Sequence, residues 1–82
     1  MIIRSQDEKV IVNLNNIDSI CIEHNVCKFD VACKNGFKDT RVGIGAYSTE
    51  EKAIKVLDMI QNEFQSEIRK HRVFQMPQDS EV

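Results

Sequence analysis

The stretch from Gly43 to Ile54 most constrains the fold, because one hydrophobic pattern stops there and another begins. Before it, apolar side chains alternate with period two, which is typical of β-strands. After it, they recur every three or four residues, which is typical of an amphipathic helix. Ser48 and Glu51 have the spacing of a capping box, in which each side chain bonds the backbone N–H of the other residue. The sequence therefore predicts a β-rich sheet followed by a C-terminal helix.

Five segments before this junction carry the strand pattern, and turn residues separate them. They span residues 1–4, 9–14, 17–23, 26–33 and 37–46. The Asn35-Gly36 pair between the last two is the strongest short signal for a β-hairpin. We expect an α+β fold: a twisted antiparallel sheet of about five strands, a β-meander, with one long C-terminal helix packed on one face. By analogy this would be a reduced pleckstrin-homology-like barrel, and the analogy carries no function.

The pattern after the junction predicts a helix over about residues 49–69. Its apolar side chains form one stripe at spacings of three and four: Ala53, Leu57, Ile60, Phe64 and Ile68. The basic run 69–72 would lie against the negative end of the helix dipole. We expect a single domain over residues 1–76 and a polar C-terminal tail over 77–82 that frays.

Length and charge limit the partners of this chain. It has 82 residues and a formal net charge of −2, which argues against nucleic acid and anionic membrane. No apolar run approaches the ~20 residues that span a bilayer. The first eight residues turn acidic too early for a signal peptide. We therefore expect a cytoplasmic protein with neither a membrane nor a nucleic acid partner.

Cys21, His24, Cys27 and Cys33 are the one cluster of soft metal ligands in the sequence. A tetrahedral zinc site takes four such ligands. A strand rises about 3.3 Å per residue, so Cys27 and Cys33 would lie roughly 20 Å apart and could not bind one ion. We expect no metal and no cofactor, and reduced thiols that pack as small apolar side chains.

The residues that could carry acid–base or nucleophilic chemistry are not spaced to meet. His24 falls at a reversal of the chain and His71 near the helix end, and neither has a nucleophile or acid at a matching distance. Glu50 and Glu51 are adjacent on the helix and do not face each other. We therefore expect no catalytic residues and a protein that is not an enzyme.

Gly43 and Gly45 leave a strip without side chains on the last strand. The usual use of such a strip is close approach by the protein's own helix or a neighbouring strand. A bound ligand is the alternative. A pocket around Gly43, Gly45 and Tyr47 could offer Lys38 and Arg41 to an anionic group. These five residues form the candidate ligand-proximal set.

The apolar run Val73, Phe74 and Met76 follows the helix. It is costly to leave in water, at about 1.5–3 kcal/mol for each large side chain. The run can dock on the edge of its own sheet beside the first strand, or on a second subunit as an added strand or apolar anchor. In so short a chain we favour self-association, with a dimer as the expected state.

Four runs of the sequence form a recognisable set: IIRSQD at 2–7, IVNLNNI-x-SI at 11–20, GAYSTEE-x-A-x-x-VL-x-x-I at 45–60 and VF-x-MP at 73–77. Together they resemble a group of small uncharacterised proteins of Gram-positive bacteria (Firmicutes) and their phages. The resemblance covers nearly the whole chain and implies a bacterial or phage cytoplasmic setting. No activity is established for that group, so the resemblance implies no functional residues.

These patterns predict a non-enzymatic binding or interaction module that self-associates, with a host protein as a further candidate partner. The alternative is a binder or sponge for a small anionic, nucleotide-like ligand, with its pocket at a subunit interface. The two hypotheses use different surfaces. The first uses Val73, Phe74 and Met76, and the second uses the strip at Gly43 and Gly45.

Overall fold

The computed structural model describes residues 2–36, 40–65 and 73–82. Over this part of the chain, six strands and one α-helix are joined by loops and two short 3-10 turns. In order, the elements are β1 (Ile2–Arg4), β2 (Ile11–Asn13), η1 (Leu14–Asn16), β3 (Ser19–Asn25), β4 (Lys28–Asn35), β5 (Thr40–Tyr47), α1 (Glu50–Gln65), β6 (Val73–Gln75) and η3 (Asp79–Glu81). The predicted α+β class is confirmed.

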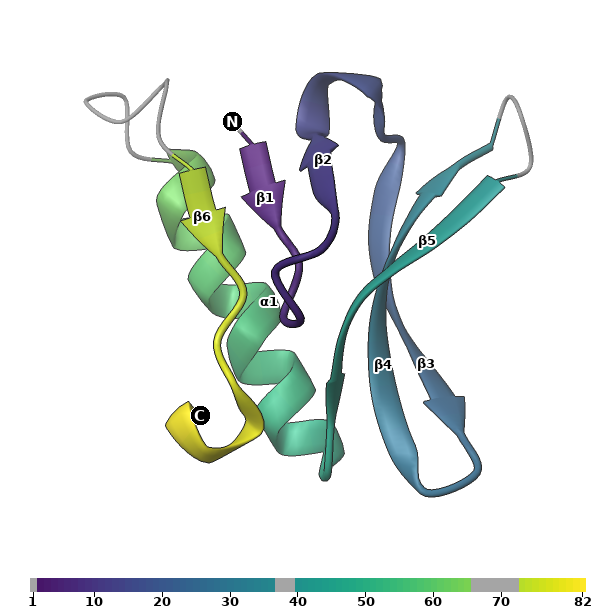
Figure 1. Cartoon of the computed structure of the whole chain (residues 1–82), viewed down its shortest axis with the longest axis vertical. Helices are drawn as coiled ribbons and strands as arrows, with labels where there is room; N and C mark the ends of the chain where they lie inside the picture. Colours follow the sequence, from purple (N-terminus) through teal and green to yellow (C-terminus); the bar gives the residue numbers. More distant parts are fainter. Residues whose placement is uncertain (1, 37–39, 66–72) are drawn as a thin grey trace.

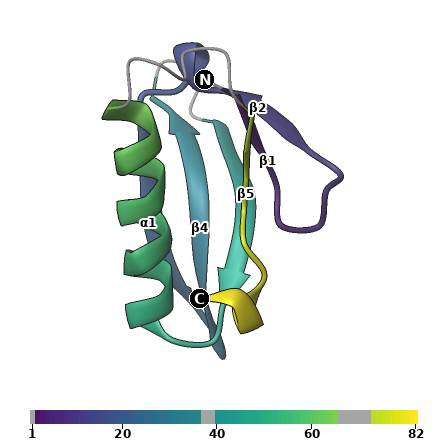
Figure 2. The same ribbon diagram turned by 90° about the vertical axis from the view of Figure 1, so that its left-hand side faces the viewer.

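The strands form two three-stranded sheets (Figure 1). One has the order β2-β1-β6 and the other the order β3-β4-β5. The predicted single five-stranded sheet is therefore wrong, and the structure does not confirm a pleckstrin-homology-like barrel. α1 packs against β3, β4 and β5. Figure 2 shows the helix along one side of the molecule and the β1–β2 hairpin at the opposite side.

The break between the sheets follows from the turn after β2. Asn13 Oδ1 accepts the N–H of Asn15 at 3.0 Å, and the N–H of Ile17 donates to the Leu14 carbonyl at 3.2 Å. These bonds make the 3-10 turn η1 in place of a tight hairpin between two neighbouring strands. As a result, β3 does not continue the sheet of β2 and pairs with β4.

A β-bulge in β5 changes which of its side chains reach the core. Gly43 and Gly45 pair with the adjacent residues Ala32 and Val31, so Ile44 is an extra residue on β5. Because the extra residue lies on one strand only, the alternation of side chains shifts by one at this point.

This shift buries Tyr47. An unbroken alternation would place Ala46 on the same face as Ile44, as the sequence pattern predicts. In the structure Ala46 pairs with Asp30, whereas Tyr47 pairs with Phe29, which packs against the core. Tyr47 is fully buried as a result.

α1 has a different N-terminal cap from the predicted one. The Thr49 hydroxyl accepts the N–H of Lys52 at 3.2 Å, which is the bond that an N-cap residue makes. The predicted capping box of Ser48 and Glu51 is wrong, because the Ser48 hydroxyl donates to the carboxylate of Asp79.

The helix contributes its predicted apolar stripe to one core. Ala53, Val56 and Ile60 are buried, and Leu57 packs against the core they help to form. The other buried members come from both sheets and the chain end: Ile3, Val12, Val31, Cys33, Ile44, Tyr47, Phe74 and Met76. The rest of the predicted helix and its basic end fall within residues 66–72, outside the described residues.

The apolar run after the helix docks within its own chain. β6 lies parallel to β1 with Phe74 opposite Ile3, and the N–H of Met76 donates to the Arg4 carbonyl at 3.0 Å. Phe74 and Met76 are buried, whereas Val73 is 51% exposed. Of the two expected arrangements, the structure has the one beside the first strand. Phe74 and Met76 are therefore core residues and not free anchors for a partner.

Met76→Ala should lower the free energy of unfolding by about 2–5 kcal/mol, because it removes a fully buried side chain. Val73→Ala, three residues earlier on an exposed position, should change it by at most about 0.5 kcal/mol. Urea unfolding followed by circular dichroism measures both. A Met76→Ala variant that kept its stability and changed only its solution mass would mean that this run docks on a second subunit.

Candidate functional site

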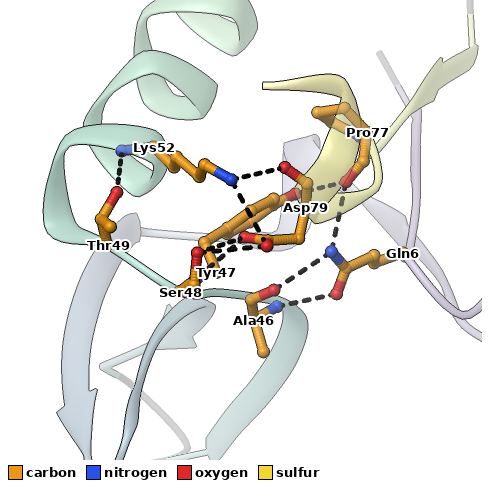
Figure 3. Close-up of polar contacts among 8 residues, drawn as sticks. All are labelled: Gln6, Ala46, Tyr47, Ser48, Thr49, Lys52, Pro77 and Asp79. Carbon is orange, nitrogen blue, oxygen red and sulfur yellow. Dashed lines mark hydrogen bonds and ion pairs between the residues drawn. The ribbon is translucent and has the colours of Figure 1, made fainter.

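Residues 77–82 fold back onto the end of β5 and the start of α1, and we call these contacts the C-terminal clamp (Figure 3). The buried hydroxyl of Tyr47 donates to the Pro77 carbonyl at 2.8 Å. Gln6 Nε2 donates to the same carbonyl at 3.3 Å, and the Gln6 amide also bonds both backbone groups of Ala46. The clamp therefore ties the end of the chain to β5 and to the β1–β2 loop.

Asp79 attaches the clamp to the start of α1. Its carboxylate accepts the Ser48 N–H at 2.8 Å and the Ser48 hydroxyl at 3.1 Å, and it lies 3.4 Å from Lys52 Nζ. These contacts, the Ser48 N–H first among them, hold the pKa of Asp79 below its ordinary value of 3.8. We expected residues 77–82 to fray. In the structure Asp79–Glu81 form η3, and Pro77 and Asp79 are held by these bonds.

Tyr47, one of the predicted ligand-proximal residues, is enclosed by the protein. Its hydroxyl is committed to Pro77, and burial raises its pKa to about 12. A Cβ added at Gly45 would lie 3.1 Å from the Tyr47 ring and 3.2 Å from Met76 Cε. The protein's own side chains therefore fill the space that Gly45 leaves, which is the usual use of such a glycine.

Three other members of the predicted set do meet. Arg41, Gly43 and Gly45 line a hollow of about 270 Å³, whose other wall is the β1–β2 loop. We call it the Gly43 hollow. The fifth predicted residue, Lys38, lies outside the described residues.

The charges of the Gly43 hollow do not favour an anion. The Arg41 guanidinium is paired with the carboxylates of Glu23 and Asp30. Asp7 adds a further carboxylate to the lining, and it is held in place by the Ser5 hydroxyl at 2.6 Å. Of the two cations in the ligand hypothesis, Arg41 is thus already paired with carboxylates, and Lys38 lies outside the described residues.

The predicted soft-ligand cluster is dispersed. Cys33 is buried in the core, Cys21 is half-buried and Cys27 is exposed in the β3–β4 turn. Burial raises the pKa of the Cys33 thiol to about 11. His24 stacks on Phe29 with the ring centroids 4.6 Å apart. Among the described residues, no three His, Cys, Asp or Glu side chains group as a metal site would require.

An apolar hollow that sequence reasoning missed lies between α1 and the chain leading into β3, and we call it the α1–β3 groove. It has a volume of about 530 Å³ and is open to solvent on one side. Its apolar lining is Leu14, Ile17, Ile20, Leu57, Ile60 and Phe64. Its polar lining is Asp18, Ser19, Gln61 and Gln65.

Phe64 is the most exposed apolar side chain of this groove. It follows Ile60 by four residues and so continues the buried stripe of α1, yet it is 66% exposed. The sequence pattern places Phe64 in the core. Periodicity identifies the apolar face of a helix but not what covers it, so no signal in the sequence could have separated the two cases.

Gly45→Ala should destabilise the fold by about 1–3 kcal/mol, because its Cβ would overpack against Tyr47 and Met76. Gly43→Ala is the matched control, since its Cβ would meet Arg41 Nη1 at an ordinary 3.6 Å. Its effect should stay within about 0.5 kcal/mol. Thermal unfolding measures both variants. Equal stability of the two would mean that the strand has free space at Gly45.

Asp79→Asn should destabilise the protein at pH 7, and the difference from wild type should close as the pH falls below 3.8. The pKa of Asp79 is lowered in the folded state, so its stabilising effect is present above the ordinary pKa and lost on protonation. Urea unfolding at pH 7 and at pH 3 tests this, with the exposed Asp58→Asn as a surface-charge control. A constant difference at both pH values would contradict the assignment.

Comparisons of the chain with protein-family models, curated proteins and solved structures give no match. No helix in the described parts of the chain has the length and apolar character needed to cross a bilayer. Function is therefore inferred from the surfaces described above, of which the α1–β3 groove is the largest and most apolar.

Proposed function

We propose that this chain is a non-enzymatic binding module that associates with a second copy of itself through the α1–β3 groove. The observation that carries the proposal is the exposed Phe64 beside a large apolar hollow. A few buried aromatic side chains supply much of the free energy of many protein–protein contacts. An exposed apolar patch with a polar border is the kind of surface on which such contacts form.

The form of the groove supports a protein partner over a small ligand. Small-molecule sites bury most of their ligand and converge a few polar groups on it. The α1–β3 groove is open on one side, and Ser19, Gln61 and Gln65 border it at exposed positions. A small apolar molecule would keep much of its surface in water there, whereas a protein face can cover the whole groove.

The charge of the groove supports a second copy as that partner. Among its described lining residues Asp18 alone is charged, and its carboxylate accepts the Gly36 N–H at 2.8 Å. Two such faces can meet without strong like-charge repulsion. An 82-residue chain buries a smaller share of its surface than a larger domain does, so covering the groove also adds stability.

The anionic-ligand alternative has weaker support. It requires a free cation at the Gly43 hollow. Of its two candidates, Arg41 is paired there with Glu23 and Asp30, and Lys38 lies outside the described residues. The apolar run after the helix also plays a different role in this proposal, since Phe74 belongs to the core and not to the interface. The proposal keeps the bacterial or phage cytoplasmic setting that the sequence resemblance implies.

Phe64→Ser should weaken self-association at least about tenfold, because it removes the aromatic anchor. The fold should remain intact, since the side chain is mostly exposed in the single chain. Ile54→Ser is the matched control: Ile54 is 44% exposed on the same helix but does not line the groove. Sedimentation velocity over a concentration series measures the mass, and circular dichroism checks the fold.

Two results would overturn this proposal. One is a wild-type chain that stays monomeric up to millimolar concentration, which would point to a different protein as the partner. The other is a Phe64→Ser variant that associates as tightly as the wild type, because the contact would then lie on another surface.

A further inference from the structure

We infer that Asn35 is a deamidation site, and that the fold slows its reaction through the bond between Asp18 and the Gly36 N–H. Asn35-Gly36 is the one Asn-Gly pair in the sequence. The pair predicts a hairpin, but neither the buried core nor the lining of the α1–β3 groove includes it. The inference does not depend on the proposed self-association.

The reaction is a ring closure within the chain. The backbone nitrogen of Gly36 attacks the side-chain amide carbon of Asn35, the bond from that carbon to Nδ2 breaks, and ammonia leaves with the proton that the Gly36 nitrogen gives up. Water then opens the five-membered succinimide at either carbonyl, which leaves aspartate or isoaspartate at position 35. Glycine, having no side chain, hinders this attack least. Every other asparagine of the chain precedes a residue with a side chain.

The structure holds the Asn35 amide away from its own backbone. Asn35 is the last residue of β4 and pairs with Thr40 of β5. The side chain of a strand residue stands roughly perpendicular to the sheet, which turns it away from the next backbone nitrogen. The Nδ2 of Asn35 donates to the Asn16 carbonyl at 3.0 Å, so the leaving amine is bound to η1. The amide has to give up this bond before it can reach the Gly36 nitrogen.

The attacking nitrogen is held as well. The Gly36 N–H donates to Asp18 Oδ2 at 2.8 Å. The nitrogen attacks only after it loses its proton, and a neighbouring carboxylate disfavours the negative charge that this loss creates. The N–H of Asp18 donates to the Lys34 carbonyl at 3.0 Å, which fixes the carboxylate beside the end of β4. Asp18 therefore slows the reaction by geometry and by charge.

Either product would lose contacts that the asparagine makes. A carboxylate at position 35 has no N–H to donate to the Asn16 carbonyl, and it brings a second negative charge to the end of β4, where Asp18 already lies. Isoaspartate also adds a carbon to the main chain, which disturbs the pairing with Thr40. Both products should therefore loosen this end of the β4–β5 pair.

The reaction rate at position 35 tests the inference in the full chain. Wild-type protein is kept at pH 8 and 37 °C, native or in guanidinium chloride, and peptide mapping by mass spectrometry follows the products. The native rate should be at least about threefold lower, because the bonds to Asp18 and Asn16 have to open first. Asn25 precedes the β-branched Val26 and should stay largely unreacted in both samples.

Asp18→Ala removes the carboxylate that holds Gly36. Its native rate at position 35 should be at least about threefold above that of the wild type, whereas the two proteins should react equally in guanidinium chloride. Asp58→Ala is the matched control, because Asp58 is an exposed carboxylate on α1, and it should keep the wild-type rate. Circular dichroism checks that both variants are folded.

Two results would overturn the inference. One is a wild-type chain that reacts as fast when native as when unfolded, a comparison that needs no variant. The other is a folded Asp18→Ala variant with an unchanged or slower rate, because the carboxylate would then be without effect or would act as a base. These rates are independent of self-association, so the proposed function is tested separately.

Discussion

The parallel pairing of β6 with β1 is the contact on which the rest of the structure depends. It makes everything from β2 to α1 a crossover connection between two neighbouring strands, which parallel pairing requires. Through it, Phe74 and Met76 enter the core that the helix and both sheets share with Ile3. The segment after the helix is thereby part of the fold, and Phe74 and Met76 are buried in it while Val73 stays exposed.

The bulge at Ile44 and the C-terminal clamp hold the chain that follows β6. The bulge turns Tyr47 inward, and its hydroxyl reaches the carbonyl of Pro77 just after β6 (Figure 3). Gly45 leaves room for that ring and for Met76. A polar chain end that composition alone predicts to fray is thus held by specific hydrogen bonds, and the space beside Gly45 is filled by the protein's own side chains.

The same arrangement leaves apolar surface at the C-terminal half of α1. The buried stripe of the helix runs past Ile60 to Phe64, where the described chain leaves a groove and not a packed core. Exposed apolar surface of this kind favours association, since covering it removes it from water. The proposed self-association therefore has the same driving force as core formation, the removal of apolar side chains from water.

The sequence by itself determined the α+β class, the hairpin around Asn35-Gly36 and the apolar stripe of α1, because each depends on residues close together along the chain. Only the tertiary structure decided the two sheets, the place of β6 and the use of Thr49 instead of Ser48 as the cap. Each of these is a competition between a local partner and a distant one: Ser48 suits a cap, but the charged carboxylate of Asp79 bonds both its N–H and its hydroxyl. Local periodicity carries no information about such distant partners, and it leaves open which apolar faces the folded chain covers.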